Sequence, residues 1–171
     1  MIKLELLEDL YVDRLYKLRD AEAQLARVLL KFAQNAESDE LAKCFEIHFG
    51  TTQTHLDRLE AILGRYSDPL TPRTSKGMRG ILAEAKILIA GAVDRGLRDE
   101  LLVATGETIA HYEIAGYSIA LTFARALHFH SDAELLRRTL ADERSVEREL
   151  ARFAQALAAE AVDDQDKAVS E

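Results

Sequence analysis

The sequence predicts an all-α protein, a bundle of four long helices with one short helix between them. Apolar residues make up 48% of the 171 residues. In long stretches they recur at three- and four-residue steps, the spacing that gathers them on one face of a helix. The two prolines, Pro69 and Pro72, lie close together, so the segments on either side are free to be helical. Strand signals are absent.

The first two helices are predicted from a leucine stripe and from end signals. The first runs from about Leu4 to Ala36. Ser38 is expected to cap the second helix, with acidic residues in the first turn, where the helix dipole favours them. Gly64 is the expected end of that helix.

A turn-rich linker at residues 65–74 holds both prolines and separates the second helix from the third. Residues 75–92 predict this third helix, which is shorter and amphipathic. Asp94, Arg95 and Gly96 are expected to interrupt it, and the next long helix is predicted at about 98–127.

The last helix is predicted to open with a capping box of Ser131 and Glu134 and to end near Ala159. This gives one bundle domain over residues 1–160 and a polar, disordered tail over residues 161–171. The short helix lies between two helical hairpins. Two hairpins joined by a long crossover form the ferritin-like arrangement.

The bulk composition narrows the classes of function. The net charge of −8 argues against general nucleic-acid binding, which needs a basic surface. No apolar run approaches the ~20 residues needed to cross a bilayer, and acidic residues near the start argue against a signal peptide. The lone cysteine, Cys44, excludes an internal disulfide. We expect a cytoplasmic protein with no membrane partner.

Polar side chains interrupt the apolar stripe of all four long helices near their middles. In chain order they are Glu22, His48, Thr52, His55, Glu113, Glu143 and, depending on helix phase, Glu147 or Val146. A carboxylate removed from water costs several kcal/mol unless it is paired, protonated or bound to a metal. A divalent cation satisfies carboxylates and imidazoles together. The alternative is a metal-free polar layer that sets the register of the helices.

Di-iron bundles supply the pattern for a metal site, with one glutamate from each of two helices and a Glu-x-x-His pair from each of the others. Glu22 and Glu113 fill the first role. The predicted metal ligands are Glu22, His55, Glu113, Glu143 and Glu147, with His48 and Thr52 as weaker candidates. The predicted cofactor is iron, as one ion or a pair, or manganese.

Three strings resemble the YciE/YciF-type ferritin-like stress proteins. They are Asp20-Ala21-Glu22-x-Gln24-Leu25, then His48 and Thr52 with His55-x-x-Arg58-Leu59-Glu60, and the most specific, His111-Tyr112-Glu113-Ile114-Ala115-Gly116-Tyr117. The resemblance extends from the first helix to about residue 157. It implies a ferritin-like bundle, a homodimer, and expression linked to stress in bacteria.

The sequence also resembles, more distantly, the di-iron site of rubrerythrin. Three ligands carry over by position: His55, Glu113 and Glu143. Thr52 stands where a bridging glutamate is expected, Ala110 removes another carboxylate, and Glu147 replaces a histidine. A single metal and a pair both stay open.

The residues support two functional hypotheses. The first is a stress-response metalloprotein that handles iron or peroxide, with ferroxidase- or peroxidase-like activity. The second is a non-enzymatic, dimeric stress or interaction protein whose polar layer holds no metal. In that case the apolar face of residues 78–92 serves dimerisation or binds a partner.

Overall fold

The computed structural model describes residues 5–66, 73–92 and 95–169, and every regular element in these ranges is a helix. The helices are α1 (Leu7–Asn35), α2 (Asp39–Leu63), α3 (Lys76–Gly91), α4 (Arg95–Ala126) and α5 (His130–Val169). The predicted all-α class is confirmed. In this described part of the chain, no helix combines the length and the apolar character that a membrane span requires.

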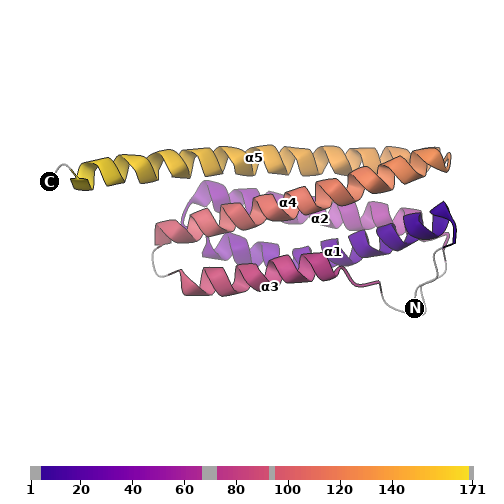
Figure 1. Cartoon of the computed structure of the whole chain (residues 1–171), viewed down its shortest axis with the longest axis horizontal. Coiled ribbons are helices and arrows are strands. Elements are labelled where there is room, and N and C mark those ends of the chain that lie inside the picture. Colours follow the sequence, from indigo (N-terminus) through magenta and orange to yellow (C-terminus); the bar gives the residue numbers. More distant parts are fainter. Residues whose placement is uncertain (1–4, 67–72, 93–94, 170–171) are drawn as a thin grey trace.

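The four long helices form two antiparallel hairpins, α1 with α2 and α4 with α5, which pack on each other through α1 with α4 and α2 with α5. The short helix α3 lies in the crossover and packs against α1 and α4 (Figure 1). This is the ferritin-like arrangement. Helix α5 reaches beyond the other helices at its C-terminal end (Figure 1).

The predicted ends of α2 are confirmed. The Ser38 hydroxyl accepts a hydrogen bond from the Leu41 N–H at 3.2 Å, and Gly64 follows the last helical residue. Asp99 of α4 also contributes, because its buried carboxylate accepts the N–H groups of Glu37 and Ser38 at 2.8 and 3.0 Å. The α1–α2 turn is therefore tied to α4.

Two predicted boundaries are wrong. Arg95 and Gly96 begin α4 instead of interrupting the chain, while Asp94 and residues 67–72 of the predicted linker lie outside the described residues. Helix α5 continues to Val169, past the expected end near Ala159.

The start of α5 also differs from the prediction, because the turn before it makes a capping box unnecessary. His128 has a φ of 59°, and the Phe129 N–H donates to the Ala124 carbonyl at 2.8 Å, the arrangement that closes a helix C-terminus. The chain re-enters a helix at once, so Ser131 lies inside α5. The Glu134 carboxylate pairs with nearby arginines instead of with the helix start.

The apolar core is divided into two clusters by a polar layer. On α1, Leu18 belongs to one cluster and Leu25 to the other, with Glu22 between them. In each of the other three long helices, too, the polar residues separate side chains of one cluster from side chains of the other. Gly116 allows α4 to approach α1 closely beside this layer, since a Cβ there would lie 2.7 Å from Leu18 Cδ2. The polar residues are thus enclosed by packed side chains at both ends.

Candidate metal centre

The polar layer brings together side chains from all four long helices. They are Glu22 of α1, His48 and His55 of α2, Glu113 of α4, and Glu143 of α5, each at most 1% exposed. Their ligand atoms form two groups, Glu22–His55–Glu143 and His48–Glu113–Glu143, and within each group these atoms all lie within 4.8 Å of one another. Glu143 belongs to both groups.

The first group is held by contacts around His55. Its Nδ1 lies 3.1 Å from Glu22 Oε1 and 3.0 Å from Glu143 Oε1. The Tyr117 hydroxyl donates to the same Glu22 oxygen at 2.5 Å. Tyr117 and Glu113 are four residues apart, so one face of α4 serves both groups.

The second group has no hydrogen bonds of its own. Both carboxylate oxygens of Glu113 and both ring nitrogens of His48 are buried without a hydrogen-bond partner, as is the Thr52 hydroxyl. Leaving such a group unpaired costs about 1–3 kcal/mol, and more when it is charged. A bound cation satisfies carboxylate oxygens and neutral imidazole nitrogens together, so the donor set fits a divalent metal.

The site reaches its metal-free charge balance through shared protons. Burial lowers the pKa of His55, but hydrogen bonds and charge interactions with Glu143 and Glu22 outweigh this and raise it to about 10. Burial raises the pKa of Glu113 well above its usual range, and the neighbouring Glu22 and Glu143 charges add to the effect. Burial also lowers the pKa of His48, which keeps that imidazole neutral. A neutral imidazole is the form that binds metals.

Charged residues lie outside the cluster beside the second ring nitrogen of His55, which has no hydrogen-bond partner. This nitrogen, Nε2, faces Asp142 Oδ2 at 3.4 Å, and the Arg58 guanidinium donates to that Asp142 oxygen at 2.6 Å and to the Thr139 hydroxyl at 3.2 Å. Metal-binding histidines commonly direct their second nitrogen toward a carboxylate. Nδ1 points into the cluster.

The structure brings most of the predicted ligands together, but not Glu147. Glu147 belongs to neither group, while its neighbour Val146, which is half-buried like Glu147, packs against the apolar core. The reason is rotational: at about 100° per residue, a residue four positions along a helix is displaced by about 40° from the first. His48, the weaker candidate, has the more central place.

Thr52 is buried beside the ligands, and its hydroxyl has no hydrogen-bond partner. Sequence reasoning gave no role to Tyr117 or Asp142. Tyr117 follows Glu113 by one helical turn, a spacing that would have pointed to it. Asp142 carries no such signal, because its neighbour Glu143 already occupies the inward position.

The bundle and its buried carboxylate–imidazole layer define a ferritin-like protein with groups that can hold a metal. The family model described as "Domain of unknown function (DUF892)" matches residues 6–163, and the chain belongs to this family. Protein YciF of Escherichia coli (strain K12) is 29% identical over 147 residues, 85% of this chain and 89% of that protein. The predicted resemblance to the YciE/YciF-type proteins is therefore confirmed.

Solved structures agree with this assignment. The crystal structure of the E. coli stress protein YciF matches with a TM-score of 0.85 at 28% identity, covering 91% of this chain and 98% of that one. YcfI from Rhodopseudomonas palustris matches with a TM-score of 0.83 at 23% identity, covering 87% and 95%. The second likeness concerns the fold alone.

Proposed function

We propose that this protein binds a pair of divalent metal ions, iron or manganese, in the polar layer and uses them in redox chemistry with oxygen or peroxide. The observation that carries the proposal is the shared Glu143. Each of the two groups contains one histidine, one glutamate of its own and this common carboxylate. That arrangement provides two adjacent positions joined by one bridging ligand.

The pattern departs from the usual di-iron bundle in a self-consistent way. The usual fourth helix carries a histidine about one turn after its glutamate, and neither Val146 nor Glu147 supplies that histidine here. His48, one turn before Thr52 on α2, supplies a nitrogen to the second group instead. Thr52 removes one of two bridging glutamates, so Glu143 is left as the single bridge. The pair would be less tightly held than in a four-glutamate site.

Two ferrous ions bound side by side would supply the two electrons that reduce hydrogen peroxide to water. The surrounding residues would control protons and access. The Tyr117 hydroxyl donates a hydrogen bond to Glu22 and fixes the position of that carboxylate. His55 presents Nδ1 to the cluster, with Asp142 near its other ring nitrogen. The apolar clusters at both ends exclude bulk water, which strengthens electrostatic interactions at the site.

Similarity to the E. coli stress protein YciF supports placing this chemistry in a stress response. The direct test is anaerobic titration with ferrous iron, followed by exposure to air or peroxide. We expect two ions per chain and a rise in ferric absorbance. A folded protein that binds no iron and shows no absorbance change would refute the proposal.

A second function is favoured by a different observation. Ile87 and Leu88 of α3 are 73% and 47% exposed, although both are large and apolar. A pair of chains could cover this face, in which case the protein would be a dimeric, non-enzymatic interaction module with a metal-free polar layer. Under this hypothesis added metal leaves the melting temperature unchanged, and Glu22→Gln with Glu113→Gln keeps or raises it. Light scattering would test the dimer.

A further inference from the structure

A pocket of ≈ 660 Å³ opens between α2 and α5 and ends at the polar layer. Its walls carry the apolar side chains Cys44, Ile47, Val146 and Phe153. His48 also lines it, although His48 is only 1% exposed and neither of its ring nitrogens has a hydrogen-bond partner. The pocket therefore runs from the surface to a ligand of the second candidate metal group.

The size of the pocket indicates what it can hold. A divalent ion with six waters needs about 200 Å³, at ~30 Å³ per water. The pocket is several times larger and falls within the range of about 300–1,000 Å³ that is usual for small-molecule sites. Apolar walls with a single imidazole at the inner end suit an organic molecule better than a hydrated ion.

The charge of the walls narrows the class of molecule. Four acidic side chains line the pocket against one basic side chain, Lys43. The acidic ones are Asp39, Glu40, Asp142 and Glu149. Three of these five charges already face an opposite charge: Lys43 pairs with Glu46 at 3.1 Å, Asp142 with Arg58 at 2.6 Å, and Glu149 with Arg152 at 2.8 Å. The carboxylates of Asp39 and Glu40 are left as the excess charge of the walls. The wall charges thus favour a cation and disfavour a carboxylate.

We propose that this pocket binds a small organic amine with an apolar body, placing one end of the molecule at His48. This inference assigns a class of organic substrate to the metal centre of the proposed function. Any chemistry on that substrate rests on the proposed function. Binding itself needs only the pocket, so it is expected in metal-free protein as well.

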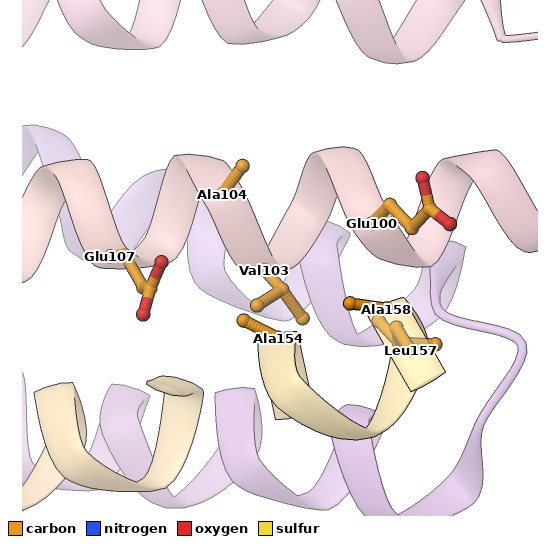
Figure 2. Close-up of a pocket in the computed structure, with 7 residues that line it drawn as sticks. All are labelled: Glu100, Val103, Ala104, Glu107, Ala154, Leu157 and Ala158. Atoms are coloured by element: carbon orange, nitrogen blue, oxygen red, sulfur yellow. The ribbon is translucent and has the colours of Figure 1, made fainter. Parts of the chain in front are cut away.

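A second hollow provides a matched control. It measures ≈ 400 Å³, lies between α4 and α5, and contains no residue of the polar layer (Figure 2). Ala104 on its wall and Ser145 on the wall of the proposed pocket are both small and exposed. Ala104 also lines a smaller hollow between α3 and α4, so tryptophan there enters one of these two hollows and leaves the proposed pocket unchanged. Tryptophan at Ser145 occupies the proposed pocket and leaves both other hollows unchanged.

The test uses metal-free protein and two probes with one apolar body, 4-phenylbutylamine and 4-phenylbutyrate. Binding is followed by calorimetry and by the rate at which N-ethylmaleimide alkylates Cys44. We expect the amine to bind at least tenfold more tightly than the carboxylate and to slow the alkylation. Ser145→Trp should weaken amine binding at least tenfold, and Ala104→Trp should leave it unchanged. If Ser145→Trp fails to fold, Ile47→Trp replaces it, since Ile47 is 61% exposed.

Equal binding of the two probes, equal effects of the two tryptophans, or unprotected Cys44 would each overturn the proposal. Metal loading is measured separately by metal content. Amine binding without metal loading would refute the proposed function but support the proposed amine pocket. Metal loading without amine binding would do the reverse.

Discussion

Glu143→Gln distinguishes two hypotheses about the polar layer: one metal centre that shares Glu143, and two independent sets of polar contacts. Glu143 is the one residue common to both groups. Glutamine keeps the volume but loses the negative charge. We expect Glu143→Gln to reduce bound metal from two ions per chain to none. Glu113→Gln should leave one ion, because the group of Glu22, His55 and Glu143 stays complete.

The size of the effect on stability follows from linkage. A ligand present at a hundred times its Kd stabilises the folded state by about 2.7 kcal/mol. Two bound ions would contribute about 5.4 kcal/mol, and for a chain of this length each kcal/mol raises Tm by about 2–4 °C, so the native protein should gain about 11–22 °C on metal addition. Glu143→Gln should abolish the gain, and Glu113→Gln should keep part of it.

The metal-free variants provide an internal check. Burial and the neighbouring carboxylates raise the pKa of Glu113 and favour its neutral form, which a glutamine amide resembles in charge and shape. Metal-free Glu113→Gln should therefore melt within a few degrees of the native protein. Any loss of metal in this variant then reflects a missing ligand and not a damaged fold.

The assay combines elemental analysis after anaerobic loading with thermal unfolding in the presence and absence of metal. Glu46→Gln is the control, because Glu46 lies on α2 with an exposed side chain, outside both groups. If Glu143→Gln retained one ion as Glu113→Gln does, Glu143 would not be a bridge. If both variants bound metal normally, the polar layer would not be the metal site.

Three further predictions concern stability. The pKa of His55 is about 10 in the folded state and 6.5 for the free group. Its protonation therefore stabilises the metal-free fold fully below pH 6.5, and this stabilisation is lost as the pH rises toward 10. A Tm that stays constant from pH 6 to 10 would contradict this. His128→Gly should stabilise by about 1 kcal/mol, because a left-handed φ of 59° strains any residue with a Cβ; urea unfolding measures the gain, and a loss would refute it. Asp99→Ala should cost about 2–3 kcal/mol by removing a charged acceptor from the N–H groups of Glu37 and Ser38, and an unchanged urea midpoint would count against that role.

The fold was accessible from the sequence because helix faces and caps are local signals. The stripe around Leu18 and Leu25 and the cap at Ser38 depend on residues at most a few turns apart. One of the errors, at the start of α5, fell where a backbone conformation decided the boundary. His128 adopts the left-handed φ that glycine usually adopts at such a turn, so the residue type at this position did not indicate the turn.

The candidate ligands were accessible only in part, for a geometric reason. Glu22, Glu113 and Glu143 each replace an apolar residue in a regular stripe, and such a replacement is visible in one helix alone. Whether His48 or Glu147 completes the second group depends on how far each helix is rotated against its neighbours. A rotation of about 40° decides it, and periodicity along one chain segment does not specify rotation to that accuracy.

The same residues explain how the layer can be stable both with and without metal. In the metal-free bundle, a proton on His55 lies between Glu22 and Glu143, and a second proton neutralises Glu113. Each divalent cation bound in the layer would carry the charge of two protons, so a pair would replace these protons and add two further positive charges among the carboxylates. Binding therefore exchanges protons for metal inside a fixed cage of helices. A site built in this way needs no refolding to load, and the two apolar clusters that enclose it hold the ligands in place in either state.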